Sequence, residues 1–187
     1  VDGWAAFWHG DGLRAKALFL RAAQRDTAFT AAALSAASAG ANYSDCLIVD
    51  SLARALERRS RPLDRMDRLA LQISDARCRG RNEEMLRLTI ERADLEPHNS
   101  AAQMPAAAAA LWANRPRRAL EMLARVNPSV DLGWSTDTTH FAYWSAVTEA
   151  LHLLGRHQDE LAAASRLPPG APLDNVWLRG SALAALS

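Results

Sequence analysis

The chain has 187 residues, of which 49% are hydrophobic and 23% are charged, a composition that argues against intrinsic disorder. Its formal net charge is only +1, so no global field favours nucleic acid or an acidic membrane as a partner. Alanine is abundant, with 39 copies, whereas Gly (9) and Pro (8) are scarce. This composition is typical of helices and offers little to strands.

Helix-forming segments separated by turn residues fill the first half of the chain. Apolar residues at helical spacing, such as Leu13, Ala17 and Leu20, mark the buried face of one segment. Thr27 is expected to cap the next helix, and the triplet 40–42 is expected to end it. Pro62 suits the first turn of a later helix. The helices predicted in this half cover residues 4–9, 13–24, 28–39, 46–59, 63–78 and 83–94.

The second half continues this pattern with one long interruption. Pro128, Gly133 and several hydroxyl residues predict a loop over 127–139, in which Trp134 is a candidate exposed anchor. No segment shows sustained period-two alternation, so the sequence predicts an all-α fold. The helices predicted here cover residues 101–113, 117–125, 141–154, 158–167 and 173–186.

The turns between helices recur along the chain. Their first residues follow one another at intervals of 31, 39, 34 and 41 residues. A period near 34 residues, with two helices in each unit, is typical of helical-repeat solenoids. The residues that open these turns are Gly10, Ala41, Gly80, Asn114 and Gly155.

Residues at fixed distances from the turns point to one repeat family. Gly10 is followed by Ala15, Phe19 and Ala22 at steps of five, four and three residues, and Trp144 stands eleven residues before another turn. This pattern resembles the tetratricopeptide repeat, in which small residues let two helices touch and large ones fill the gap to the next pair. The resemblance covers nearly the whole chain and implies a right-handed α-α superhelix of about five helix pairs.

Both ends of the sequence fall inside this pattern. Only nine residues precede Gly10, and 173–186 resembles a first helix without its partner. Terminal repeats usually carry polar caps, but Trp4 and Phe7 stand near one end and Leu186 near the other. We therefore expect residues 1–187 to be a single repeat domain that belongs to a longer chain, or one that self-associates through its ends.

Chemistry-bearing motifs are missing from the sequence. It has no Gly-rich nucleotide loop, no Gly-x-Ser-x-Gly and no His-Glu-x-x-His, so we expect no catalysis and no cofactor. His152 and His157 are five residues apart, a spacing that does not place both on one helical face, so no metal site is expected. Cys46 and Cys78 are interpreted as two small isolated thiols. The pair Asp159-Glu160 is interpreted as a helix-dipole contact, although Glu160 stands where the repeat family has a small residue.

The resemblance also implies a concave wall formed by the first helix of each pair. Small residues around one Trp, one Met and a few charges would suit a groove for a peptide or a helix. The residues carried onto this wall are Ser35, Asp67, Ser74, Arg77, Met104, Trp112, Ser145, Glu149 and His152.

These observations predict a non-catalytic interaction or sensor module that binds a peptide or partner helix in its groove. Similar repeat regions are appended to bacterial transcriptional regulators and serine/threonine kinases, so we expect a larger bacterial regulatory protein. The alternative is a small-molecule sensor that uses the same groove. No nucleic-acid partner is expected for this segment, and the longest apolar stretch, 101–113, is too short to span a membrane. The sequence contains no recognisable targeting signal. We expect the protein to lie in the cytoplasm, or in the periplasm if the parent protein has an upstream membrane helix.

Overall fold

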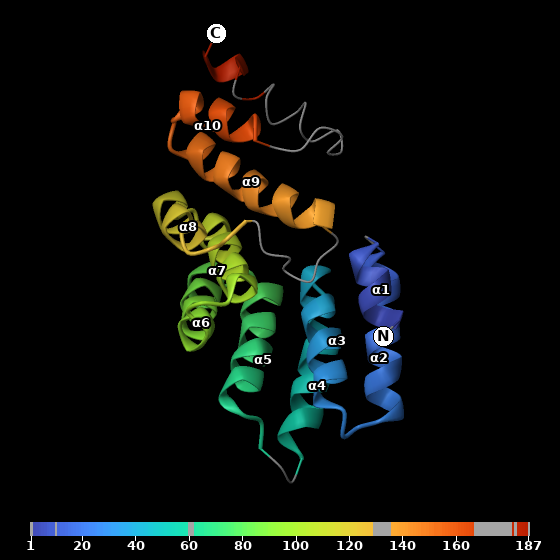
Figure 1. Cartoon of the computed structure of the whole chain (residues 1–187). Coiled ribbons are helices and arrows are strands. Elements are labelled where there is room, and N and C mark those ends of the chain that lie inside the picture. The colour runs from blue at the N-terminus through green and yellow to red at the C-terminus, as the bar shows by residue number, and fades with distance from the viewer. Residues whose placement is uncertain are drawn as a thin grey trace. The chain divides into compact units, whose positions relative to one another are not determined.

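The computed structural model describes residues 2–9, 11–59, 62–128, 136–166, 181 and 183–186. These residues form helices and turns and contain no strand (Figure 1), which confirms the all-α prediction for the described part of the chain. The helices are α1 (Asp2–Trp8), α2 (Gly12–Arg25), α3 (Thr30–Asn42), α4 (Cys46–Glu57), α5 (Arg65–Cys78), α6 (Asn82–Leu95), α7 (Ser100–Trp112), α8 (Pro116–Leu123), α9 (Thr136–Leu153) and α10 (His157–Ala164).

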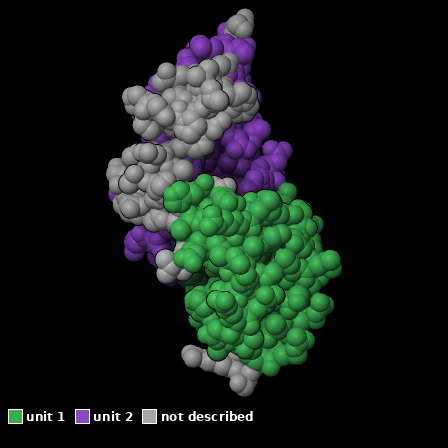
Figure 2. Space-filling view, turned by 90° about the vertical axis from the view of Figure 1, so that its right-hand side faces the viewer, with its two compact units in different colours: residues 1–92 green, residues 93–187 purple. Residues whose placement is uncertain are grey.

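The chain divides into two compact units, Val1–Arg92 and Ala93–Ser187 (Figure 2). In unit 1, α1 packs on α2, α2 on α3, α3 on both α4 and α5, and α4 on α5. In unit 2, α7 packs on α8 and α9, α8 on α9, and α9 on α10. Within the described residues no helix combines the length and the hydropathy needed to cross a bilayer.

The odd-numbered helices α3, α5, α7 and α9 end in the same turn. In each case the second residue past the helix has a positive φ, between 54° and 68°; these residues are Ser44, Gly80, Asn114 and Gly155. The next backbone N–H then donates to the carbonyl five residues earlier, as in Arg81 to Ala76 and Arg156 to Leu151. This 6→1 hydrogen bond satisfies a carbonyl that the end of a helix would otherwise leave unpaired.

The turn that ends α3 lies three residues later than Ala41, where the sequence predicts it. Gly40 and Ala41 are buried helical residues of α3, and the positive-φ residue is Ser44. Gly40 faces α4 here, and a Cβ at this position would be in van der Waals contact with Ile48 at 3.4 Å. With Ser44 in place of Ala41, the first two intervals of 31 and 39 residues become 34 and 36.

Three predicted helix starts are also corrected. Thr27 is not the cap of α3, whose N-cap position is held by Phe29; the carboxylate of Asp26 instead accepts from the Ala28 N–H in the preceding turn. Pro62 lies outside α5, which begins after Asp64, a side chain that accepts from the Asp67 N–H at 2.8 Å. Helix α9 begins at Thr136, so the last part of the predicted loop 127–139 is helical.

Alanine dominates the cores of both units. In α3, Ala32, Ala33, Ala36, Ala37 and Ala39 are buried, and in α7 so are Ala106, Ala107, Ala109 and Ala110. Small side chains let neighbouring helix axes approach closely, which gives the abundant alanine a structural role. Trp134 and most of the predicted helix 173–186 lie outside the described residues.

Candidate functional site

A pocket of about 520 Å³ opens among α1, α2 and α3 of unit 1. Its wall is built by close contact between the first two helices, since a side chain at Gly3 would meet the ring of Phe19 at 2.6 Å. Trp4 lies edge-on to that ring, with 5.1 Å between centroids. The pocket is lined by Asp2, Gly3, Trp4, Leu18, Phe19, Arg21, Ala22, Arg25, Phe29, Ala31, Ala32 and Ser35.

The rim of this pocket is aromatic and basic. Trp4 is 47% exposed and Phe29 is 51% exposed, although large apolar side chains gain most from burial. Arg21 and Arg25 lie one turn apart on α2 and are both exposed. Neither makes an ion pair within the described part of the chain. The pocket therefore combines apolar and small lining residues with two arginines and one carboxylate, that of Asp2.

The structure places only one of the predicted wall residues, Ser35, in this pocket. Within unit 1, Ser74 is buried and its hydroxyl donates to the Ala70 carbonyl at 2.9 Å. Asp67 and Arg77 are half-buried. Burial, together with the nearby Asp64 carboxylate, raises the pKa of Asp67, and burial lowers the pKa of Arg77.

The remaining wall residues belong to unit 2. Met104 is buried in the core, so its side chain is not open to a partner. Trp112 is 45% exposed at the end of α7. Ser145 is half-buried, with its carbonyl accepting from the Thr148 hydroxyl at 2.9 Å, and Glu149 is exposed.

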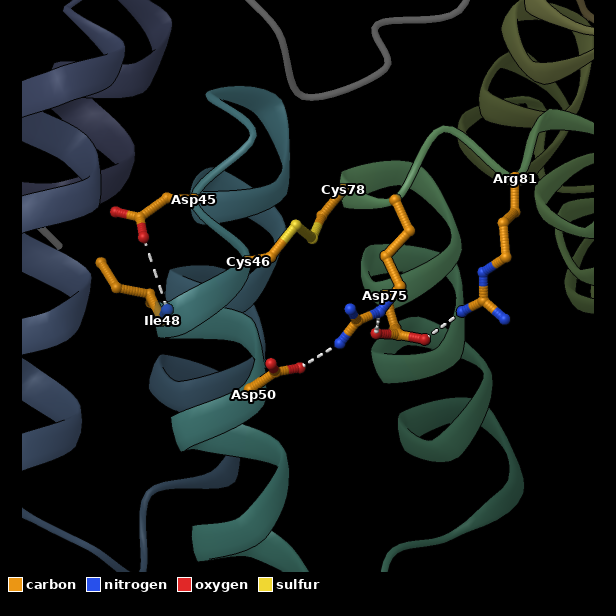
Figure 3. Close-up of a disulfide and its surroundings, with 8 residues drawn as sticks. Asp45, Cys46, Ile48, Asp50, Asp75, Cys78 and Arg81 are labelled. Atoms are coloured by element: carbon orange, nitrogen blue, oxygen red, sulfur yellow. Dashed lines mark hydrogen bonds and ion pairs between the residues drawn. A yellow bond between two sulfur atoms is a disulfide. The ribbon is translucent and has the colours of Figure 1, made fainter.

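Cys46 and Cys78 are joined in a disulfide, with their Cα atoms 5.6 Å apart (Figure 3). The interpretation of these residues as two isolated thiols is therefore wrong. Cys46 is the first residue of α4 and Cys78 is the last residue of α5. The two helices pack on each other and have similar lengths, so the start of one meets the end of the next. A disulfide of this kind persists in oxidising compartments.

An ion-pair network lies beside the disulfide. Arg79 donates from Nε to Asp75 at 2.7 Å and from its terminal nitrogen to Asp50 of α4 at 2.5 Å. These hydrogen bonds to Asp75 and Asp50 raise the pKa of Arg79. Arg81 pairs with Asp75 as well (Figure 3). The same α4–α5 junction is thus held by a covalent bond and by surface charges.

The sharpest cluster of titratable groups lies where α9 ends and α10 begins. Glu160 is buried, with only 1% of its side chain exposed. Its Oε2 lies 3.1 Å from Nδ1 of His152 and 2.9 Å from Nδ1 of His157. The hydroxyl of Ser181 donates to Oε1 at 3.2 Å. A buried carboxylate is costly unless it is paired and hydrogen-bonded, and these contacts supply that pairing.

The spacing argument against this cluster is wrong because the two histidines lie on different helices. His152 is in the last turn of α9 and His157 is the first residue of α10. The turn at Gly155, with φ of +68°, reverses the chain between them. The two imidazoles therefore lie edge-on to each other, with ring centroids 5.3 Å apart.

The position of Glu160 relative to its turn is the sequence feature that indicates a buried charge. The residue five positions after each positive-φ turn residue is at most 2% exposed. In the other turns this position holds Val49, Met85 and Ala119, all apolar. Glu160 puts a charge in the same buried position, so it is more than a residue that complements the helix dipole.

We compared the chain with protein-family models, with curated proteins and with solved structures, and none of them matches it.

Proposed function

We propose that this chain is a non-catalytic binding module that takes up a peptide or a partner helix. The pocket among α1, α2 and α3 carries the proposal, because its lining includes exposed aromatic side chains, small residues and two arginines that make no ion pair in the described part of the chain. An apolar anchor next to acidic residues is the ligand chemistry that complements this arrangement.

The recurrent turns support a repeat architecture of the tetratricopeptide type for the same module. Helices of one pair pack on each other, as α3 does on α4 and α7 on α8. The first helix of a pair also packs on the first helix of the next, as α3 does on α5 and α7 on α9. A chain of such neighbour contacts is the packing scheme of α-α superhelices, which present one wall of helices to a ligand.

A small-molecule sensor is the second candidate. The pocket volume of about 520 Å³ falls in the range of about 300 to 1,000 Å³ that is usual for small-molecule sites. Its two exposed aromatic side chains at the rim favour the larger peptide ligand, because a peptide can cover them while inserting one side chain.

Selection from a random peptide library on the purified chain tests the proposal. We expect enriched peptides to carry an aromatic or aliphatic residue flanked by Asp or Glu. Phe29→Ala should weaken their binding roughly tenfold, as expected for loss of an aromatic anchor. The pair Arg21→Glu and Arg25→Glu should weaken it by a similar factor at low salt and by less at high salt.

Two matched variants control for non-specific effects. Leu47→Ala removes an exposed apolar side chain (81% exposed) outside the pocket. Arg117→Glu reverses an exposed charge on α8. Both should bind like the unaltered chain. Enriched peptides that bind the Phe29 and arginine variants with full affinity would refute the pocket as the binding site. Failure of the library, combined with saturable binding of a small apolar compound that Phe29→Ala abolishes, would establish the sensor instead.

A further inference from the structure

We propose that His152, His157 and Glu160 form a binding site for a single transition-metal ion of the Zn²⁺ class. This site belongs to unit 2 and does not depend on the peptide-binding proposal, which rests on unit 1. The distances between the donor atoms, the burial of the carboxylate and the chemistry of the three ligands support this site.

The donor atoms are already spaced as ligands of one ion. One ligand atom from each of the three side chains lies within 4.8 Å of the other two. The carboxylate Oε2 is 3.1 Å from one imidazole Nδ1 and 2.9 Å from the other. In a tetrahedral zinc site with bonds of about 2.0 to 2.1 Å, neighbouring ligand atoms are roughly 3.3 Å apart. An ion could therefore enter once the carboxylate moves a few tenths of an ångström away from each imidazole and the two imidazole donors, which lie within 4.8 Å of each other, adjust to the same spacing.

Two features of the fold hold the ligands in place. His157 and Glu160 lie three residues apart in the first turn of α10, so they share one face of that helix. His152 reaches them from the end of α9 across the turn at Gly155. The helices that carry the ligands pack on each other. Ligands on packed helices keep their geometry better than ligands on loops.

The buried carboxylate is oriented from its other side. Ser181 donates to Oε1 at 3.2 Å, which is the kind of outer contact that fixes a metal-ligating carboxylate. Nδ1 of His152 lies 3.1 Å from both carboxylate oxygens, and Nδ1 of His157 lies 2.9 Å from Oε2. Because Glu160 replaces the apolar residues found at the equivalent positions Val49, Met85 and Ala119, the burial of its charge is not required for helix packing.

The ligand set selects the class of ion. Two imidazoles and one carboxylate suit Zn²⁺, Co²⁺, Ni²⁺ or Cu²⁺, whereas Mg²⁺ and Ca²⁺ prefer oxygen ligands throughout. Three protein ligands leave one tetrahedral position for water or for a donor from a partner. The side chain of His152 is 46% exposed, so an ion can reach the site from solvent without unfolding of either helix.

Metal titration of the full chain, purified without a histidine tag and stripped with chelator, tests the site. Calorimetry should show one Zn²⁺ per chain. Co²⁺ should give the visible absorption of a tetrahedral site, and a tenfold excess of Mg²⁺ should not displace it. His152→Ala, His157→Ala and Glu160→Gln should each weaken Zn²⁺ binding roughly 100-fold or more, because each removes one of only three protein ligands.

His98→Ala is the matched control, since it removes an exposed histidine in the turn between α6 and α7 of the same unit. It should bind Zn²⁺ like the unaltered chain. Circular dichroism of each metal-free variant shows whether its helices form, and His152→Ala is expected to fold because its side chain is half-exposed. If the unaltered chain binds no Zn²⁺, or if folded His152→Ala binds it undiminished, the cluster is a hydrogen-bonded carboxylate only and the proposal is refuted.

Discussion

The two units use the same position next to a turn for different chemistry. Cys46 and His157 are each the first residue of the second helix in a pair, two residues after the positive-φ residue of the turn. In unit 1 this position forms a covalent bond to Cys78 of α5. In unit 2 it contacts the buried carboxylate of Glu160. A fixed backbone geometry thus presents a side chain in a reproducible place, and the residue type decides what that place does.

The two units also differ in the hydrogen bonds that their buried polar residues make. In unit 1, the hydroxyls of Ser74 and Thr89 donate to carbonyls of their own helices, so no other element depends on them. In unit 2, Gln103 is fully buried and donates from Nε2 to the Ala93 carbonyl at 3.1 Å, near the end of α6. Unit 1 therefore adds a covalent link between helices to its apolar core and ion pairs, whereas unit 2 adds a buried polar contact between elements.

Removal of the disulfide should have the largest effect and should fall on unit 1. Its two cysteines are separated by 32 residues, so closure of this loop stabilises the folded state by about 3 to 4 kcal/mol in the chain-entropy estimate. Reduction, or the double change Cys46→Ser and Cys78→Ser, should lower amide protection in α3, α4 and α5, measured by hydrogen exchange. Protection in α9 and α10 should not change.

The reductant has a direct control. Added to the double variant, it should alter nothing further. Equal loss of protection in both units would contradict the assignment of this constraint to unit 1.

Among the buried polar residues of unit 2, truncation of Gln103 should lower the free energy of unfolding the most. Gln103→Ala opens a cavity and leaves the buried Ala93 carbonyl with fewer donors, at a cost of about 2 to 3 kcal/mol. Gln103→Met keeps most of the volume and loses the hydrogen bond, but it also removes the buried Oε1, which has no partner in the described part of the chain, so it should cost no more than about 1 kcal/mol. Urea unfolding followed by circular dichroism measures both. Equal losses in the two variants would show that packing contributes little.

The turns should respond to substitution by about 1 kcal/mol. Gly80 and Gly155 adopt φ of +67° and +68°, and an added Cβ would meet nothing within 4 Å at either one. Replacement by Ala should therefore cost only the backbone strain of about 1 kcal/mol. Ser44 has φ of 54°, so Ser44→Gly should raise the free energy of unfolding by up to about 1 kcal/mol.

Thermal unfolding measures these changes, and Asn114→Gly provides the comparison. Asn tolerates the left-handed region better than Ser does, so replacing Asn114 by Gly should raise the free energy of unfolding by less than Ser44→Gly does. A larger gain at Asn114 than at Ser44 would show that side-chain contacts, and not φ, control the turn.

The smallest expected effect concerns Asp67. Burial and the Asp64 carboxylate raise the pKa of Asp67 above its ordinary value of 3.8. The folded state therefore favours the protonated form, and this contribution is present below about pH 4 and is lost as pH rises through the raised pKa. Asp67→Asn should slightly raise the melting temperature at pH 7 relative to the unaltered chain and reduce its change between pH 4 and pH 7.

Glu57→Gln, which removes the same charge from an exposed side chain of α4, should leave that pH dependence as it was. A pH profile of Asp67→Asn identical to that of the unaltered chain would contradict the assigned shift.

The sequence predicts the helices well because their apolar periodicity and turn residues are local. The turns at Gly80, Asn114 and Gly155 were located correctly. The turn at Ser44 was missed because Gly40 looks like a helix breaker, although it is a contact position against Ile48. The end of α3 is set by its packing against α4, and the apolar pattern of one helix does not reveal such contacts.

The candidate sites were harder to predict for a related reason. The predicted wall uses only the first helix of each pair and includes Ser35, whereas the pocket is also lined by Arg21 and Arg25 of α2. The five-residue spacing between His152 and His157 excludes a shared site only if both residues lie on one helix, whereas a turn separates them. Both errors concern how consecutive helices meet, which depends on tertiary contacts.

The bond between Cys46 and Cys78 turns the intervening chain into a closed covalent ring. A protease that cuts once between these residues, for example in the segment that joins α4 to α5, would open the ring without releasing a fragment. The nicked chain should run as one species on a non-reducing gel and as two after reduction. The severed ends stay tethered at the α4–α5 junction, so unit 1 can survive a backbone break that would divide an unbridged helical array.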